Sequence, residues 1–137
     1  MFSRFYGIVF CLFILLSCKD DFEENYTWHS IKVTATAYNS LKNQTDSDPH
    51  ITAYGDSLKP GMKYIAVSND LKKMGLRHNT PVKIKGLEGI YLVKDRMHSR
   101  WQNRIDIYMG IDVKAAKEWG RKKVTIEYGL PRELNSK

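Results

Sequence analysis

The chain has 137 residues and a formal net charge of +7 at pH 7, with 42% hydrophobic and 27% charged residues. This composition excludes a low-complexity or disordered chain, and the length leaves room for one globular domain. The basic balance favours anionic partners but does not choose among them.

The first part of the chain, residues 1–17, is predicted to be a signal peptide. Arg4 gives a short positive start, and the apolar run at residues 8–16 is too short to span a bilayer. The run ends in the letters LLSC, which resemble a bacterial lipoprotein box with Cys18 as the residue that carries the lipid. The alternative is a secretory signal that ends near a chance cysteine.

Residues 18–30 are predicted to be the lipidated N-terminus and a flexible tether, because they show no hydrophobic period. The letters KDD at residues 19–21 look like a signal for the outer face of the outer membrane, and a charged linker is the alternative. Several acyl chains on Cys18 would hold the protein firmly at the membrane. We therefore expect a lipid-anchored protein of the outer membrane, on its periplasmic face or at the cell surface.

The two cysteines of the sequence indicate whether the mature domain can contain a disulfide. Cys11 would leave with the signal and Cys18 would be acylated, so the domain has no disulfide although its compartment is oxidising. A basic domain outside the cytoplasm meets anionic polymers or lipid headgroups before nucleic acid, so we expect no nucleic-acid partner. We also expect a monomer.

The folded domain is predicted at residues 31–129, followed by a C-terminal tail at 130–137. Alternating or β-rich apolar runs predict strands. These runs lie at residues 31–38, 64–67, 82–84, 90–93, 104–109 and 123–128, and residues 51–55 suggest one further short strand. Residues 39–49 are rich in turn formers and predict a surface loop.

Two short helices are predicted between the strands. One starts after Ser68 or Asn69 and ends at Gly75, and the other follows an Asp112 N-cap and ends at Gly120. About six short strands without a strand–helix–strand rhythm favour an all-β fold that closes into a barrel, because closure removes the sheet edges.

Two carboxylates near the predicted strand at 104–109 carry the main functional signal. Alternation places Ile105, Ile107 and Met109 on one face of this strand, and Asp106 with Tyr108 on the other. An aspartate in mid-strand is unusual, because its charge is costly to bury unless it is paired. Asp106 is therefore either a functional carboxylate or a structural hydrogen-bond anchor, and the same two readings apply to Asp95.

The order of several short motifs resembles that of the three-aspartate domain family. This family includes the domain of membrane-bound lytic transglycosylase A and of stationary-phase and resuscitation-type muralytic proteins. The matching letters are TAYG at 52–55, IAV at 65–67, VKIKG at 82–86, VKD at 93–95, NRIDIY at 103–108 and WGRKKV at 119–124. The resemblance covers residues 31–129 and implies a six-stranded double-psi β-barrel with one or two short helices, similar to the barrels of rare lipoprotein A and the expansins.

The resemblance also implies roles for the aspartates. It assigns the catalytic acid/base to Asp106 and the second aspartate of the family name to Asp95. The first aspartate is replaced by Ser68, with Asp70 two residues later, and residues 96–102 replace a glycine-rich loop. These departures concern the wall of the cleft that would hold the substrate.

The expected chemistry is cleavage of the β-1,4 glycosidic bond of peptidoglycan. The leaving oxygen needs a proton from an acid that stays protonated near neutral pH. We expect Asp106 on the inner wall of the barrel, facing Asp95, where burial and a neighbouring carboxylate raise its pKa. A lytic transglycosylase can use one carboxylate twice and forms a 1,6-anhydro product, whereas a hydrolase would recruit Asp95 as well.

The substrate-binding candidates are five residues: Arg96, Trp101, Arg104, Tyr108 and Ser68. Arginines at 96, 100 and 104 could bind the carboxylates of stem peptides or belong to a solvated loop. Trp101 could stack on a sugar ring or cap the barrel, and Tyr108 could orient Asp106 or simply pack. The histidines have no metal-ligand spacing, so we expect no metal and no cofactor.

The sequence therefore predicts an outer-membrane lipoprotein that cleaves peptidoglycan glycan strands, with Asp106 and Asp95 as catalytic residues. The first alternative is a non-catalytic module that binds peptidoglycan or another glycan on the same barrel. A third interpretation is a surface adhesion or assembly lipoprotein.

Overall fold

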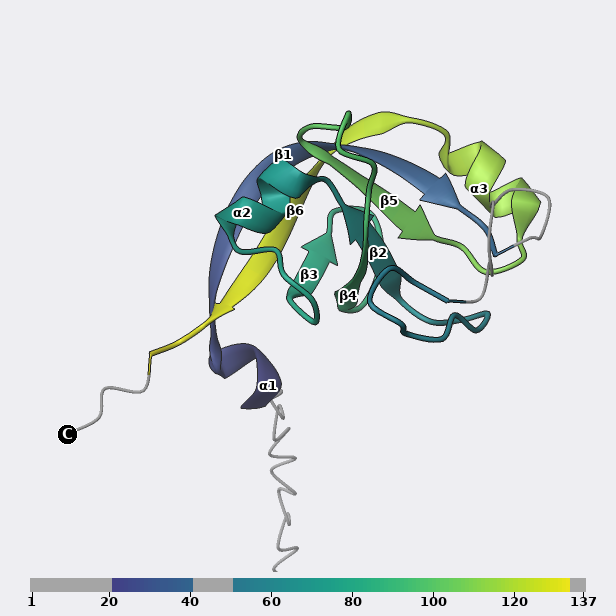
Figure 1. The fold of residues 1–137 in the computed structure, drawn as a ribbon. Coiled ribbons are helices and arrows are strands. Elements are labelled where there is room, and N and C mark those ends of the chain that lie inside the picture. The colour runs from purple at the N-terminus through teal and green to yellow at the C-terminus, as the bar shows by residue number, and fades with distance from the viewer. Residues whose placement is uncertain (1–20, 41–50, 134–137) are drawn as a thin grey trace, which may run out of the picture.

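The computed structural model describes residues 21–40 and 51–133 of the chain (Figure 1). The predicted signal peptide, the predicted lipidation site Cys18 and most of the predicted loop at 39–49 lie outside these residues. In the described part, no helix is long and apolar enough to cross a membrane.

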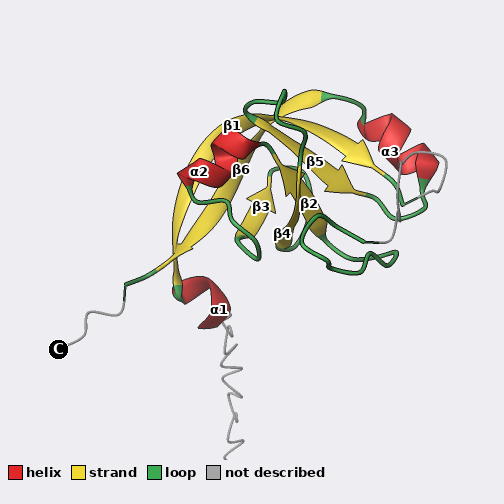
Figure 2. Ribbon diagram, in the orientation of Figure 1, coloured by secondary structure: helices red, strands yellow, loops and turns green. Residues whose placement is uncertain are grey.

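Strands are the main secondary structure of the described residues (Figure 2). The strands are β1 Tyr26–Tyr38, β2 Tyr64–Val67, β3 Pro81–Ile84, β4 Tyr91–Arg96, β5 Arg104–Tyr108 and β6 Lys122–Pro131. The helices are α1 Asp21–Glu24, α2 Asn69–Met74 and α3 Val113–Trp119. The prediction of a mostly β fold with six strands and few short helices is confirmed.

The six strands close into a barrel in the order β1-β5-β2-β4-β3-β6. β1 runs parallel to β5, and β2 runs parallel to β4, while the other four neighbouring pairs are antiparallel. Parallel neighbours need long connections, so each parallel pair joins strands that are distant in the sequence. The long β1 and β6 curve together around one side of the barrel (Figure 1).

The barrel interior is filled by the alternate apolar residues of the strands. The largest fully buried side chains on the strands include Val33, Ile65, Ile105, Ile107 and Ile126. Because the side-chain period of a strand is two, each inward aliphatic residue leaves its neighbours on the outer face. The core is a packed aliphatic cluster, and the polar face of β5 must lie outside it.

The ends of the chain depart from the predicted boundaries. β1 begins at Tyr26, so the predicted tether at 18–30 is wrong for residues 26–30. These residues are paired with β6, where Tyr26 stands opposite Pro131 and Ser30 opposite Glu127. β6 correspondingly includes Leu130, which the sequence places in the tail. The alternation of Tyr26 and Trp28 with polar residues is short, and the two extensions complete each other by pairing.

Two further elements differ from the predictions. Residues 51–55 form no strand and contribute only an isolated bridge between Ile51 and Ser57. α1 precedes β1 and was not predicted. It is attached by the ring of Phe22, whose centroid lies 5.1 Å from that of Tyr26, and by a hydrogen bond from Trp28 Nε1 to the carbonyl of Glu23.

The helices α2 and α3 lie where the sequence predicts them. In α3, Asp112 is the N-cap, and its Oδ1 accepts a hydrogen bond of 2.9 Å from the backbone N–H of Ala115. α2 follows Ser68 and ends at Gly75, whose φ of 121° explains the need for glycine there. α3 contacts β1 and covers the end of the barrel where β1 and β5 finish (Figure 1).

Candidate functional site

The polar face of β5 points away from the barrel core. Ile105 and Ile107 are fully buried inside, and Asp106 stands between them with its side chain on the opposite face. The expectation that Asp106 lies on the inner wall of the barrel is therefore wrong. Alternation identified its face correctly, but the aliphatic side chains occupy the interior and leave the carboxylate on the outer face, where it is half-buried.

One residue of β2 brings the two aspartates to the same place. Ala66 pairs with Asp106 on β5 and with Asp95 on β4, so it lies between them. Its methyl side chain leaves space above the sheet. The three strands therefore form the floor of a shallow site with a carboxylate at each edge.

A β-bulge in β4 turns Asp95 toward this floor. Ile65 pairs with Val93, but the next residue, Ala66, pairs with Asp95, so Lys94 is an additional residue in β4. With strict alternation after the buried Val93, Asp95 would point into the core. Bulges re-aim side chains in this way and often occur beside active sites.

Asp95 is fixed by backbone amides. Its Oδ1 accepts hydrogen bonds from the N–H of Ala53, at 2.9 Å, and from the N–H of Arg96, at 2.8 Å. The first bond ties the segment around residues 52–56 to β4. Asp95 therefore acts as a loop anchor as well as a wall of the site.

Asp106 has a different environment. Burial raises the pKa of its carboxyl above the usual value, and the nearby charge of Asp95 adds to the rise. A hydrogen bond of 3.0 Å from Thr36 Oγ1 to Asp106 Oδ1 and the charge of Arg104 act in the opposite direction. The net direction is upward, as expected for a carboxyl that can hold a proton closer to neutral pH.

An open cleft of about 280 Å³ lies over Asp106. Its lining combines both carboxylates with two aromatic rings and a segment that follows β4. The lining residues are Tyr38, Ala66, Asp95, Arg96, Met97, His98, Trp101 and Asp106. The segment at 97–101 forms one wall and is attached to β2 by a hydrogen bond from the N–H of Met97 to the carbonyl of Val67, at 2.9 Å.

Tyr38 lines the cleft without a predicted role. Its hydroxyl is buried and has no hydrogen-bond partner among the described residues. Burial, followed by the charges of Asp95 and Asp106, raises its pKa far above the usual value, so the hydroxyl keeps its proton and can donate it in a hydrogen bond. No local pattern in the sequence indicates this role, because it depends on the parallel pairing of β1 with β5.

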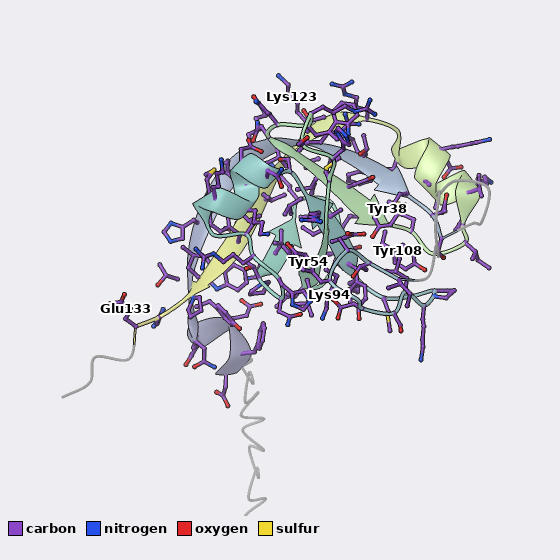
Figure 3. The ribbon with its side chains drawn as sticks, viewed as in Figure 1. Tyr38, Tyr54, Lys94, Tyr108, Lys123 and Glu133 are labelled. Carbon is purple, nitrogen blue, oxygen red and sulfur yellow. The ribbon has the colours of Figure 1, made fainter. Side chains whose placement is uncertain are left out.

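Tyr108 lies beside Tyr38 but has a structural role (Figure 3). The two residues pair across β1 and β5, with ring centroids 5.4 Å apart. Tyr108 is only 3% exposed, and its hydroxyl lies 2.9 Å from Ser40 Oγ. It does not line the cleft, so the prediction that it binds substrate is not supported by its position.

Ser68 is also displaced from the predicted substrate-binding set. Its side chain is fully buried, and its Oγ accepts a hydrogen bond of 3.0 Å from the N–H of Arg104. Asp70 has a related role, because its Oδ2 accepts a bond of 2.7 Å from the N–H of Asn103. Both residues attach the start of β5 to the start of α2 and cannot meet a ligand in the cleft.

The three remaining substrate-binding candidates lie close together, at the end of β4, in the loop that follows it and at the start of β5. Arg96 and Trp101 line the cleft. Arg104 lies behind Trp101, with its Cζ 3.9 Å from the centroid of the indole ring. The structure therefore gathers Asp95, Asp106, Arg96, Trp101 and Arg104 at one site, and it separates Tyr108 and Ser68 from that site.

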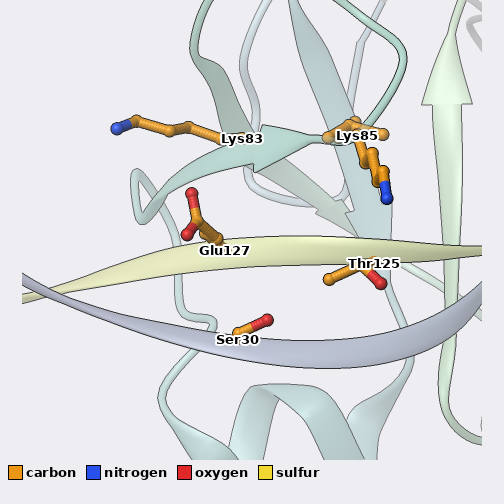
Figure 4. A pocket seen from close by; sticks show the side chains of 6 residues that line it. Ser30, Lys83, Lys85, Thr125 and Glu127 are labelled. Atoms are coloured by element: carbon orange, nitrogen blue, oxygen red, sulfur yellow. The ribbon is translucent and has the colours of Figure 1, made fainter.

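A second hollow of about 310 Å³ lies on the outer face of β1, β3 and β6 (Figure 4). It is lined by Ser30, Lys83, Ile84, Lys85, Thr125 and Glu127. Lys83 is already engaged by Glu23, at 2.6 Å. This hollow contains none of the predicted site residues. Within residues 21–40 and 51–133, no group of His, Cys, Asp and Glu side chains could hold a metal ion.

These features define a class of protein, namely a closed six-stranded β-barrel with an open cleft on its outer face that holds two carboxylates. No family model matches the chain, and no match was found among curated proteins.

Among solved structures, the chain is similar to an apo expansin of Clavibacter michiganensis. The sequence identity is 19% and the TM-score is 0.45, over 79% of this chain and 53% of that chain. A mutant of the same expansin in complex with cellohexaose gives 17% identity and a TM-score of 0.45, over 80% and 54% of the two chains. The chain thus spans about half the length of the expansin structures that it matches.

Proposed function

We propose that the cleft binds glycan strands of peptidoglycan and that Asp106 cleaves their β-1,4 bonds as acid and base. The observation that carries this proposal is the environment of Asp106. Its carboxyl is half-buried at the floor of an open cleft, and burial raises its pKa. A general acid works best when its pKa approaches the working pH, and partial desolvation shifts the pKa of a carboxyl in that direction.

In the proposed reaction, Asp106 gives its proton to the glycosidic oxygen as the bond between that oxygen and the anomeric carbon breaks. The C6 hydroxyl of the same muramoyl residue attacks the anomeric carbon, and its proton passes to the Asp106 carboxylate. The products are a 1,6-anhydro sugar end and a free hydroxyl on the leaving sugar. The acid is regenerated and no water is consumed.

The state of Asp95 supports a single-carboxylate mechanism. One of its oxygens already accepts two backbone hydrogen bonds, which favours a fixed structural anchor over a group that activates water. Asp95 and Asp106 are also both next to Ala66 in the sheet, so their backbones are about 10 Å apart at the usual strand spacing. Asp95 would act mainly by raising the pKa of Asp106.

A second candidate function is a glycan-binding module without catalysis. The same anchoring of Asp95 favours it, because backbone amides already engage this carboxylate and leave Asp106 as the other carboxyl of the cleft. Trp101 and Tyr38 supply ring surfaces, and Arg96 supplies hydrogen-bond donors. The two functions share the binding step and differ only in whether Asp106 transfers its proton.

Two further proposals complete this assignment. We infer that the barrel is of the double-psi type, which is supported by its two parallel pairs, β1 with β5 and β2 with β4. We also propose that Cys18 anchors the protein to the outer membrane. Two residues separate Cys18 from the start of α1, so the folded part of the chain would lie close to the lipid. Cys18→Ala should then leave the chain either unprocessed or soluble on cell fractionation. Continued membrane association of a variant from which the signal peptide has been removed, after a high-salt wash, would exclude the lipid anchor.

The catalytic proposal is tested by incubating the mature protein with purified peptidoglycan and identifying the products by mass spectrometry. Anhydro-muropeptides are expected, and Asp106→Asn should reduce their formation by about 10²–10⁴-fold, the usual contribution of a general acid–base group. Products with reducing ends would indicate a hydrolase. Binding without products, in the wild type and the variant alike, would establish the non-catalytic module.

A further inference from the structure

A cluster of arginines surrounds Trp101 at the edge of the cleft. The Cζ atom of Arg104 lies 3.9 Å from the centroid of the indole ring, and the Cζ atom of Arg100 lies 4.7 Å from it. Trp101 itself lines the cleft. The indole therefore connects two guanidinium groups directly to the space above Asp106.

The charge of Arg104 is poorly compensated. Its Nε and Nη1 atoms are buried and have no hydrogen-bond partner among the described residues. None of the salt bridges in the described part of the chain includes Arg104. Burial lowers the pKa of Arg104, as do the nearby charges of Arg121 and Arg100, and only Asp106 acts against them. Donor atoms that are buried without an acceptor are costly, so a carboxylate that supplied an acceptor to this partly buried guanidinium would be stabilised here.

Strand pairing adds to the positive charge. Thr34 on β1 pairs with Arg104 on one side and with Lys123 on the other, so these three side chains form a row on the outer face. Lys123 is exposed at this end of the barrel (Figure 3), and Arg121 is exposed just before β6 begins. The cluster of Arg100, Arg104 and Arg121 is therefore part of a basic surface that borders the cleft.

We propose that this arginine cluster and Trp101 form a subsite for a carboxylate carried by the glycan in the cleft. The inference rests on the proposed glycan binding and specifies its substrate class: the glycan is carboxylate-bearing, not neutral. A guanidinium group suits a carboxylate because its planar fork can donate two parallel hydrogen bonds. The indole beside it restricts the fork to one orientation and excludes water from one side.

Peptidoglycan offers two sources of such a carboxylate. In intact strands, the stem peptide is attached to the lactyl group of the glycan, and the carboxylates belong to the peptide. When the peptide is removed by an amidase, the lactyl group itself ends in a free carboxylate. A chitin oligosaccharide has a related β-1,4 backbone without either group, so it serves as the neutral comparison.

The test measures equilibrium binding to peptidoglycan, to amidase-treated glycan strands and to chitin oligosaccharides. All proteins carry Asp106→Asn, so that no glycan is consumed during the measurement. Arg104→Gln and Arg121→Gln are compared with Arg132→Gln, which removes the same charge beyond the far end of β6, next to Asn25. Arg121 is exposed, so its replacement keeps the test valid if Arg104→Gln fails to fold.

The protein that carries only Asp106→Asn is expected to bind at least one carboxylate-bearing polymer more tightly than chitin. Arg104→Gln and Arg121→Gln should each weaken that binding by about tenfold, the scale of one charge-assisted hydrogen bond, and leave chitin binding unchanged. Preference for intact or for amidase-treated strands identifies the peptide or the lactyl carboxylate. Equal affinity for chitin, or equal losses in the Arg132 control, would overturn the inference.

These outcomes are separable from the catalytic proposal. A protein that binds carboxylate-bearing glycan through Arg104 but never releases product supports the subsite and contradicts catalysis by Asp106. A protein with a native Asp106 that cleaves peptidoglycan equally well after Arg104→Gln and Arg121→Gln supports catalysis and contradicts the subsite.

Discussion

Thr36 Oγ1 lies 3.0 Å from Asp106 Oδ1 across the parallel pair of β1 and β5. The carbonyl of Ile105 is a more distant acceptor, at 3.4 Å, so the carboxylate is the better partner for the hydroxyl. A donor of this kind stabilises the ionised form of the carboxyl. Thr36 therefore limits how far burial can raise the pKa of Asp106.

Thr36→Val should raise the pKa of Asp106 further, because the ionised carboxyl loses its donor while the side-chain shape is nearly kept. The alkaline limb of the turnover–pH profile, where the acid loses its proton, should move upward by about 1 pH unit. Thr34→Val is the control, since Thr34 lies on the same face of β1 but pairs with Arg104. The same profile for both variants would show that the hydroxyl does not tune Asp106.

Tyr38→Phe and Tyr108→Phe should have opposite consequences. Tyr38 loses a hydroxyl that has no partner among the described residues. The free energy of unfolding of Tyr38→Phe should therefore equal that of the wild type to within about 0.5 kcal/mol, or exceed it. Tyr108 loses a buried hydrogen bond with Ser40, which should cost about 1 kcal/mol. Glycan affinity should fall only for Tyr38→Phe. Urea unfolding and a binding titration check both results, and a reversed order of stabilities would contradict the roles assigned here.

The stability of the fold should depend on pH through Asp106. Its pKa is raised by burial in the folded state, so the unfolded chain ionises first as pH rises above about 3.9, the ordinary value. Between the two pKa values the folded state binds more protons, and the free energy of unfolding falls with rising pH. Asp106→Asn should therefore be more stable than wild type at pH 7, with the difference closing near pH 3.5.

Asp56→Asn provides a control of opposite sign for this pH dependence. Burial acts to raise the pKa of Asp56, but hydrogen bonds from His78 and Lys94 hold it below the usual value. Its contribution is present above the unfolded pKa and is lost as pH falls. Asp56→Asn should thus be less stable than wild type at pH 7. Thermal unfolding of both variants from pH 3.5 to 7 measures the two slopes, and parallel slopes would exclude the assigned pKa directions.

Asp95 allows its two roles to be separated. Asp95→Ala removes the acceptor for the N–H groups of Ala53 and Arg96, which should destabilise the protein by about 2 kcal/mol and expose the Ala53 amide to hydrogen exchange. Asp95→Asn keeps an acceptor oxygen and should keep the loop protected. Because it removes a negative neighbour, it should lower the pKa of Asp106 and move the alkaline limb downward, the opposite of Thr36→Val. An equally large loss of turnover in Asp95→Asn and Asp106→Asn would favour a two-carboxylate hydrolase.

Local patterns predicted the individual elements well. The run at 64–67 is β2, and the helix after Asp112 has the predicted bounds, because each depends on alternation or on a cap within a few residues. The extensions of β1 and β6 were missed, since the alternation of Tyr26 and Trp28 with polar residues is short and the segment is completed as a strand by pairing with β6. Periodicity cannot detect pairing between segments about a hundred residues apart.

The candidate site was predicted in part. The loop after β4 was identified through Asp95, Arg96 and Trp101, which are close together in the sequence. Thr36 and Tyr38 were missed because they reach Asp106 only through the parallel pairing of β1 with β5. Ser68 and Tyr108 were assigned to substrate because alternation gives the face of a side chain but not what covers that face. The β-bulge at Lys94, which brings Asp95 to the surface, has no local signal either.

The position of β1 in the barrel determines when this protein can fold. Both neighbours of β1 come from the last third of the chain, with β5 at residues 104–108 and β6 at 122–131. A chain that emerges N-terminus first presents β1 with both edges unpaired until almost all of it has been delivered, and such edges are prone to aggregate. Non-local pairing of this kind also makes folding slow. Because Thr36 and Asp106 meet only when β1 and β5 join, the candidate acid acquires its tuned environment in the same event that closes the barrel, and a nascent chain carries no prematurely assembled site.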